Sequence, residues 1–148
     1  MSTKIAVVTG ASSGIGLVLS LDLVKQQVPV IMLARRKEVM DKAIAEARLT
    51  EKQAFPISVD VSNFDDFKAA VQKGLNHFKS VTGDEIILDL FVNNAGIMPL
   101  GKVNEIKLED YTNMVNINVL GVMHGIKIAS EFMVPNKTGT IVNVSSIA

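Results

Sequence analysis

Three glycines near the start of the chain are spaced for phosphate chemistry. Residues 9–16 read Thr-Gly-Ala-Ser-Ser-Gly-Ile-Gly, directly after the apolar run at residues 5–8 and before a helix-patterned segment. Glycines here allow a tight strand-to-helix turn, in which backbone N–H groups approach a pyrophosphate at the helix N-terminus. An ordinary tight turn is the alternative. The position after the first strand of an alternating βα chain favours the nucleotide loop.

The elements that would position this loop can be read along the chain. Short apolar runs alternate with helix-patterned segments, which is typical of a parallel sheet covered by helices on both faces. We predict strands over 4–9, 28–33, 54–59, 87–92 and 139–144, and helices over 14–26, 37–50, 63–79 and 108–134. The last helix is long enough to be broken into two pieces. Right-handed crossovers favour a doubly wound α/β sheet of five parallel strands in the order 3-2-1-4-5, with a ligand at the carboxyl ends of strands one and four.

Composition limits the class of protein. The chain has 148 residues, of which 48% are hydrophobic, so we expect one domain over residues 1–148. Fifteen basic and fifteen acidic side chains leave no net charge to attract nucleic acid or an anionic membrane. The lack of cysteine excludes thiolate metal sites and thiol nucleophiles. We find no targeting segment and no run long enough to span a bilayer, and we expect a soluble, cytoplasmic protein.

The end of the chain is unusual for such a fold. The fifth predicted strand is of the buried type, yet the sequence stops at Ala148, four residues after it. Nothing remains to cover that edge of the sheet. We therefore expect the domain to be truncated after the fifth strand and incomplete at its C-terminus.

Three further motifs make a family resemblance specific. Residues 93–96 read Asn-Asn-Ala-Gly after the fourth strand, residues 116–121 read Asn-Ile-Asn-Val-Leu-Gly, and residues 141–146 read Ile-Val-Asn-Val-Ser-Ser. With the glycine spacing of residues 10–16, they make the chain resemble the short-chain dehydrogenase/reductase family from Lys4 onward. The resemblance implies a Rossmann fold and an oxidoreductase that uses a nicotinamide dinucleotide.

The resemblance also implies roles for single residues. Around the pyrophosphate and adjacent ribose it places Gly10, Ser12, Ser13, Gly14, Ile15 and Gly16. Beside the cofactor on the cleft floor it places Asn93, Ala95 and Gly96, with Asn93 also bracing the sheet.

Asp60 and Val61 resemble the pair that flanks the adenine. A carboxylate there can accept a hydrogen bond from the exocyclic amine. The alternative is that Asp60 caps the following helix, for which Ser62 or Asn63 is better placed.

The choice of cofactor is made at the end of the second strand. An NAD(H) enzyme places an acidic residue near position 34, whereas an arginine accommodates the 2′-phosphate of NADP(H). This chain has Ala34, Arg35 and Arg36. We predict NADP(H) over NAD(H), with Arg35 as the main discriminator and Arg36 as a helper that could also simply begin a solvated helix.

The catalytic group implied by the resemblance is half present. Ser146 matches the serine that polarises the substrate, and Asn118 matches the asparagine that supports a water relay. The family's Tyr-x-x-x-Lys pair is absent. The single tyrosine, Tyr111, has Val115 four residues on and cannot substitute.

Other polar and apolar residues receive no cofactor role. His77 and His124 lie without a second ligand at metal-binding spacing, so we predict no metal. Gly121 and Gly125 permit close helix approach, either within the sheet layer or at a subunit contact. We expect the complete protein to form a homodimer or homotetramer through the long helix, with contributions from Ile126, Ala129, Phe132 and Met133.

These observations favour an NADP(H)-dependent oxidoreductase that transfers hydride between nicotinamide and a small carbonyl or alcohol substrate. Residues 1–148 alone are expected to be inactive in turnover, because the Tyr-x-x-x-Lys pair is missing. One rival is an NADP(H)-binding module without turnover. Another is a structural remnant that binds no cofactor.

Overall fold

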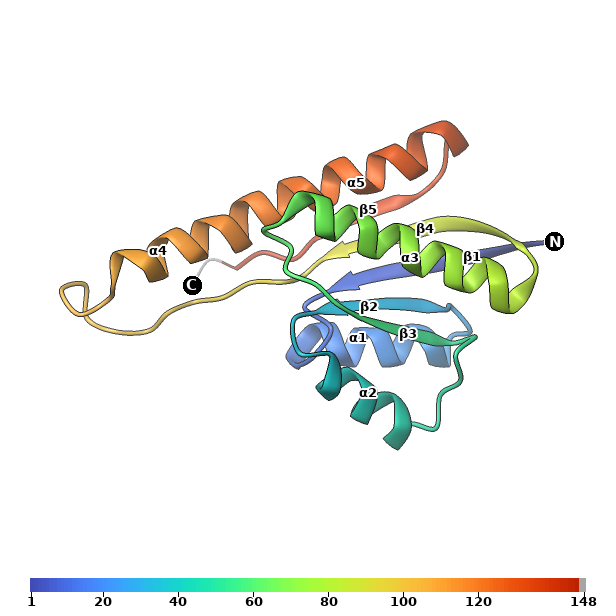
Figure 1. The fold of residues 1–148 in the computed structure, drawn as a ribbon, viewed down its shortest axis with the longest axis horizontal. Helices are drawn as coiled ribbons and strands as arrows, with labels where there is room; N and C mark the ends of the chain where they lie inside the picture. Colours follow the sequence, from blue (N-terminus) through green and yellow to red (C-terminus); the bar gives the residue numbers. More distant parts are fainter. Residues whose placement is uncertain (147–148) are drawn as a thin grey trace.

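Five apolar runs form the sheet and hydrogen-bond side by side in parallel (Figure 1). The computed structural model describes residues 1–146. Its strands are β1 (Ser2–Thr9), β2 (Val30–Ala34), β3 (Ala54–Ser58), β4 (Glu85–Asn93) and β5 (Thr140–Asn143). Their order is β3-β2-β1-β4-β5. The doubly wound topology predicted from the sequence is confirmed; the predicted domain end at residue 148 lies outside the described residues.

Successive residues of β1 pack into two hydrophobic cores, one on each face of the sheet. The helices that cover these faces are α1 (Gly14–Lys25), α2 (Lys37–Glu46), α3 (Phe64–Thr82) and α5 (Gly121–Asn136). Ile5 and Val7 face the core formed with α3 and α5, whereas Ala6 and Val8 face the core formed with α1 and α2. Because strand side chains alternate between faces, a strand covered on both sides is apolar throughout. All five residues of β2 are accordingly buried.

Two helix ends differ from the sequence prediction by three or more residues. Helix α2 ends at Glu46 rather than at residue 50, because the chain turns away through Arg48, whose φ is 54°. Helix α3 continues to Thr82 rather than residue 79. It is closed by Gly83, which has a φ of 74° and donates its N–H to Lys79 O.

The long helix is continuous rather than broken. Helix α4 (Leu108–Val115) passes through a π-helical turn, η1 (Asn116–Leu120), into α5. A π turn carries i→i+5 hydrogen bonds, is rare, and occurs frequently at functional sites. Gly121 and Gly125 both face inward, toward Val61 and Asn93 respectively. Their close approach therefore serves the sheet layer of this chain.

The same helix contradicts the expectation that the chain has no apolar run long enough to span a bilayer. Leu108–Asn136 forms 29 helical residues with a mean hydropathy of 1.3, so by length and composition it could cross a membrane. The expectation that no run is long enough was wrong. One third of its apolar window is buried, and Ile128 and Ala129 are fully covered by the sheet. A helix that covers a sheet in this way has the same length and composition as a membrane span.

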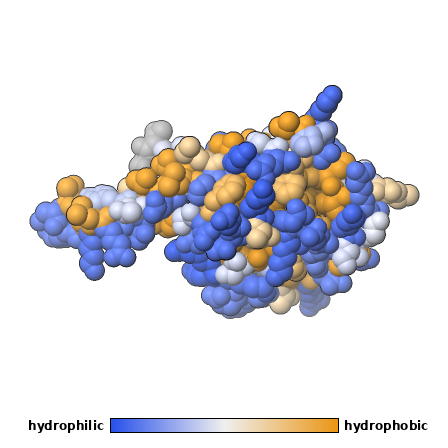
Figure 2. Space-filling model, turned by 45° about the horizontal axis from the view of Figure 1, so that its top comes forward, coloured by the Kyte–Doolittle hydropathy of each residue, from blue (hydrophilic) through white to orange (hydrophobic). Residues whose placement is uncertain are grey.

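The outward face of this helix is also apolar. Ala129 and Met133, two of the four residues expected at a subunit contact, are buried in this chain's own core, so that part of the expectation was wrong. Ile126 remains partly exposed, and the exposed apolar residues nearby are Val115, Val119, Leu120, Met123 and Val134. Helix α4 and the segment before it extend away from the sheet as an arm (Figure 1). Figure 2 shows that arm as a narrow projection on which hydrophobic and hydrophilic residues are mixed.

An ion pair joins the two helices on one face of the sheet. Lys68 Nζ of α3 lies 2.5 Å from Glu131 Oε2 of α5, and Lys127 Nζ lies 3.6 Å from Glu131 Oε1. The hydrogen bond from Lys68 is the largest influence that holds the pKa of Glu131 below its ordinary value. A lowered folded-state pKa stabilises the fold above the unfolded-state pKa, and this contribution is lost as the pH falls through the folded-state pKa.

We expect Lys68→Gln to raise the pKa of Glu131 more than Lys127→Gln does, because Lys68 makes the closer contact. A carbon-detected NMR titration of the Glu131 carboxyl measures both shifts. A larger rise in the Lys127 variant would show that the α3–α5 pair is not the dominant interaction.

Candidate functional site

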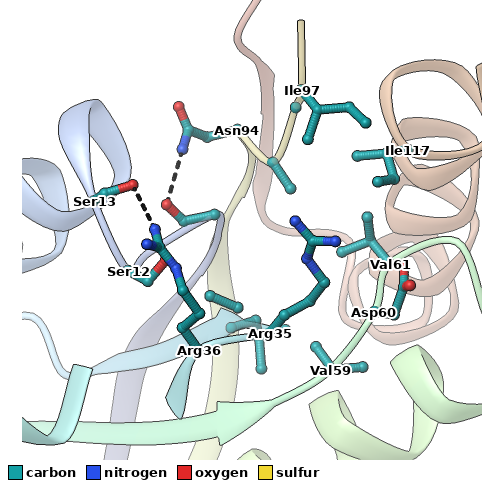
Figure 3. Close-up of a pocket in the computed structure, with 15 residues that line it drawn as sticks. Ser12, Ser13, Arg35, Arg36, Val59, Asp60, Val61, Asn94, Ile97 and Ile117 are labelled. Atoms are coloured by element: carbon teal, nitrogen blue, oxygen red, sulfur yellow. Dashed lines mark hydrogen bonds between the residues drawn. The ribbon is translucent and has the colours of Figure 1, made fainter. Parts of the chain in front are cut away.

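A cleft opens at the carboxyl ends of the central strands, where the sheet order reverses between β1 and β4. It has a volume of about 330 Å³, within the range of small-molecule sites. Its walls come from the glycine loop, the end of β2, residues 59–61, residues 94–97 and Ile117 of the π turn (Figure 3). This is the place at which doubly wound sheets bind their ligands.

The glycine loop is folded tightly against the segment after β4. Gly10 has a φ of 65°, and a Cβ built on it would lie 2.9 Å from Ala95 Cα. A Cβ on Gly16 would lie 2.3 Å from Gly10 O and 2.5 Å from Asn94 Nδ2. Side chains at either position would push the loop away from its neighbours. Gly10 and Gly16 therefore allow the backbone of the loop to pack closely against residues 94 and 95. At Gly14 the loop stays open, since a Cβ there would meet nothing within 4 Å.

Thr9 and Asn94 lock that packing with hydrogen bonds. Thr9 Oγ1 accepts from the backbone N–H groups of Asn94 and Ala95 at 2.9 and 3.0 Å, and donates to Val92 O at 3.3 Å. The Asn94 side-chain amide donates to Thr9 O at 3.1 Å and Gly10 O at 3.4 Å. The loops after β1 and β4 are thus one hydrogen-bonded unit.

The two roles predicted for Asn93 are divided between Asn93 and Asn94. Asn93 is buried, donates to Asn143 Oδ1 at 2.9 Å and packs against Gly125. It braces the sheet as expected, but Asn94 is the residue that lines the cleft. Asn94 was not among the site residues predicted from the sequence. The signal available was its position one residue beyond the last strand residue, where the chain leaves the sheet.

Both arginines after β2 point into the cleft (Figure 3). Arg36 Nη2 donates to Ser12 Oγ and Ser13 Oγ, each at 3.3 Å, whereas Arg35 extends toward the Val61 side. The next cation, Lys37, is engaged by Asp41 at 2.7 Å. Two guanidinium groups in one cleft make this end of β2 suited to an anion with several acceptor oxygens. Arg36 reaches the glycine loop, so it is more than the start of a solvated helix.

Asp60 and Val61 form the wall opposite the loop. Asp60 Oδ1 accepts from the backbone N–H of Ser62 at 2.9 Å and from its hydroxyl at 2.7 Å. Asn63 caps α3 by accepting from Asp66 N at 3.1 Å. The alternative that Asp60 caps this helix is therefore wrong, and its carboxylate shapes the turn beside the cleft.

The remaining sequence-predicted residues surround the cleft or lie outside it. Those that line it are Gly10, Ser12, Ser13, Arg35, Arg36, Asp60, Val61, Ala95 and Gly96. Those that do not line it are Gly14, Ile15, Gly16, Asn93, Asn118 and Ser146. Besides Asn94, the lining residues that were not predicted as site residues are apolar: Leu33, Ala34, Val59, Ile97 and Ile117.

Asn118 fastens one wall of the cleft to the π turn. Its Oδ1 accepts from Ile97 N at 2.8 Å, and its Nδ2 donates to Ile97 O at 2.7 Å. Both polar atoms of the side chain are therefore committed to one residue of the loop after β4. Ser146 follows β5 and is exposed.

Neither histidine is placed as part of a metal site. His77 Nε2 bonds to Glu51 O at 2.8 Å, and His124 Nδ1 bonds to Val61 O at 2.9 Å. Within residues 1–146, no group of three or more histidine, cysteine or acidic residues could hold an ion.

Comparisons with known proteins agree with this geometry. The model of the short chain dehydrogenase family matches residues 4–148. An uncharacterized oxidoreductase of Listeria monocytogenes is 31% identical over the whole chain, which covers 57% of that protein. A 3-oxoacyl-[acyl-carrier-protein] reductase of Staphylococcus aureus is 32% identical over 98% of the chain, which covers 56% of that protein. The chain thus spans just over half the length of these curated relatives.

A solved structure is similar over the same stretch. A variant of actinorhodin polyketide ketoreductase, determined with NADPH, superposes with a TM-score of 0.83 and is 30% identical. The likeness covers 97% of this chain and 53% of the ketoreductase.

Proposed function

We propose a function from the premise that the chain belongs to the short chain dehydrogenase family. Residues 1–148 are the dinucleotide-binding domain of an NADP(H)-dependent oxidoreductase. The observation that carries the proposal is the pair of arginines beside an open glycine loop in one cleft. The bound cofactor supplies the hydride, and the protein supplies its orientation. The substrate is a small carbonyl or alcohol compound.

The cleft offers a contact for each part of the cofactor. The glycine loop, with Gly10, Ser12 and Ser13, suits the pyrophosphate, because it combines backbone N–H groups with the N-terminus of α1. Asp60 and Val61 suit the adenine. We assign the nicotinamide side to residues 94–97.

The preference for NADP(H) follows from charge at the end of β2. Ala34, where an NAD(H) enzyme would carry a carboxylate, is buried and has no acceptor side chain. Arg35 and Arg36 can each give a charge-assisted hydrogen bond to the 2′-phosphate, and a guanidinium can also stack on adenine. An NADPH-bound ketoreductase among the structural relatives supports the same cofactor.

The two residues predicted as catalytic, Ser146 and Asn118, are assigned different roles. We assign Ser146 to the substrate oxygen, as the family resemblance implies. Asn118 is assigned to hold Ile97 in the cleft wall, because both of its side-chain polar atoms are used there. Residues 1–148 contain one tyrosine and no Tyr-x-x-x-Lys pair.

Partners and location follow as proposals from the same premise. The reductase and ketoreductase names of the relatives favour a carbonyl substrate. We propose a cytoplasmic homodimer or homotetramer that associates through the exposed apolar face of the long helix. The zero net charge makes nucleic acid an unfavourable partner.

Calorimetric titration tests the cofactor assignment directly. We expect NADPH to bind at least about tenfold more tightly than NADH, since one charge-assisted contact is worth about 1.5 to 3 kcal/mol. NADPH at a hundred times its Kd should also raise the free energy of unfolding by about 2.7 kcal/mol. Equal affinities for NADPH and NADH would contradict the NADP(H) preference, and tighter binding of NADH would reverse it. Binding of neither cofactor would support a structural remnant.

A further inference from the structure

One wall of the cleft is held in place by the long helix. His124 Nδ1 of α5 lies 2.9 Å from Val61 O. One turn earlier, the Val61 side chain packs over Gly121, where a Cβ would lie 2.6 Å from Val61 Cγ2. Val61 is 6% exposed and lines the cleft. Its backbone and its side chain are thus both fixed by the same helix.

The direction of the hydrogen bond is determined by chemistry. A carbonyl oxygen can only accept, so His124 Nδ1 carries the hydrogen and donates it. This holds for the Nδ1–H tautomer and for the protonated ring. The edge-to-face contact with Phe64, at 5.4 Å between ring centroids and 71° between planes, fixes the ring orientation. Because Phe64 begins α3, the imidazole contacts both Val61, in the segment that joins β3 to α3, and the first residue of that helix.

Residues 59–63, which join β3 to α3, also have hydrogen bonds among themselves. These bonds shape the segment but do not attach it to α5. Asp60 bonds to Ser62, and Asn63 N donates to Asp60 O at 3.1 Å. These bonds fix the conformation of the turn, but they do not fix its position relative to the rest of the chain. At its start the segment is attached to the sheet, because Val59 N donates to Ala34 O at 3.1 Å. At Val61, beside the cleft, it is attached to α5.

We propose that His124 is a positioning residue for the adenine half of the cofactor cleft. Its Nδ1–H holds the Val61 carbonyl, so that the Asp60–Val61 wall is preset before the ligand arrives. A preset wall lowers the cost of ordering on binding. The inference rests on the proposed function, because it takes the Asp60–Val61 side of the cleft as the place of the adenine.

Two substitutions separate the donor from the bulk of the ring. His124→Leu keeps an apolar side chain of similar size without a donor, whereas His124→Asn keeps an N–H on the atom attached to Cγ. His77→Leu is the matched control. His77 also bonds to a backbone carbonyl and stacks on Phe55 at 3.7 Å, but it contacts Glu51 and does not line the cleft.

The probes are NADPH and adenosine 2′,5′-bisphosphate, measured by calorimetry with the purified protein. We expect His124→Leu to weaken both by about three- to tenfold, the worth of one neutral hydrogen bond, and by the same factor. His124→Asn should stay within about twofold of the unmodified protein for both probes. His77→Leu should lower the melting temperature without changing either Kd.

The outcomes distinguish this inference from its premise. If the unmodified protein binds neither probe, the proposed function and the inference both fail. If it binds both and His124→Leu binds them equally well, the inference alone fails. An asparagine variant as weak as the leucine variant would also overturn it, because the N–H would then not be the cause. Loss for NADPH with none for the bisphosphate would place the effect outside the adenine half and overturn it too.

Discussion

Replacing Arg35 and Arg36 together by glutamine is expected to weaken NADPH binding by about a hundredfold and NADH binding by no more than about threefold. Each charge-assisted hydrogen bond is worth about 1.5 to 3 kcal/mol, and neighbouring contacts are not fully additive. Both guanidinium groups point into the cleft, and the 2′-phosphate is the only group that NADPH adds to NADH. Calorimetry with the two cofactors measures the change in preference.

The single variants identify which arginine is responsible. Arg36 also bonds to Ser12 and Ser13, so its loss could disturb the loop and reduce the affinity for both cofactors. Arg35 makes no contact with the loop serines, so Arg35→Gln should change the NADPH affinity selectively. Lys37→Gln is the matched control, because this neighbouring cation pairs with Asp41 outside the cleft. Equal losses of NADPH and NADH in the Arg35 variant would refute the NADP(H) assignment.

The second large effect is expected at the glycine loop. Gly16→Ala should weaken NADPH and NADH alike, by about ten- to a hundredfold, the worth of one charge-assisted hydrogen bond to the pyrophosphate that both cofactors carry. The new Cβ would lie 2.3 Å from Gly10 O and 2.5 Å from Asn94 Nδ2. Gly10 must then move, and with it the bonds between Asn94 and the loop.

A loss of stability alone has to be excluded in this experiment. Overpacking at Gly16 is expected to lower the free energy of unfolding by about 1 to 3 kcal/mol. Gly83→Ala provides the comparison, since Gly83 lies at the far end of α3 with a φ of 74° and open space around it. It should lower stability by about 1 to 2 kcal/mol and leave both affinities unchanged. Unaltered cofactor binding in the Gly16 variant would make the loop an ordinary turn.

The strands were predictable from the sequence because buried parallel strands are apolar throughout, and β2 is an example. Their order was predictable because right-handed crossovers favour the doubly wound arrangement. The position of the cleft then followed from the order. Helix ends were less predictable, since α2 stops where Arg48 adopts a positive φ that its residue type does not indicate. The π turn was not predictable either, because residues 116–120 fit an apolar α-helical pattern equally well.

The spacing of residues in the sequence did not predict the roles of neighbouring site residues, because these roles depend on strand ends, rotamers and hydrogen-bond partners. Whether Asn93 or Asn94 faces the cleft depends on the residue at which β4 leaves the sheet. Which arginine reaches the loop depends on the rotamers of two long side chains. His124 and Asn118 act through backbone carbonyl and N–H groups of residues distant in sequence, and such partners become visible only in the fold.

The π turn gives the long helix two helical phases. An α-helix advances about 100° per residue, so a single added residue rotates everything before it relative to everything after it. The phase of α5 is set by Gly121 and Gly125 against the sheet, and that of the preceding turn by Asn118 against Ile97. If one residue between these anchors were deleted, either Asn118 would keep its contact with Ile97 or the glycines would keep theirs with the sheet, but not both. The spacing from Asn118 to Gly121 is therefore fixed to the residue, and insertions or deletions should be tolerated in the arm but not here.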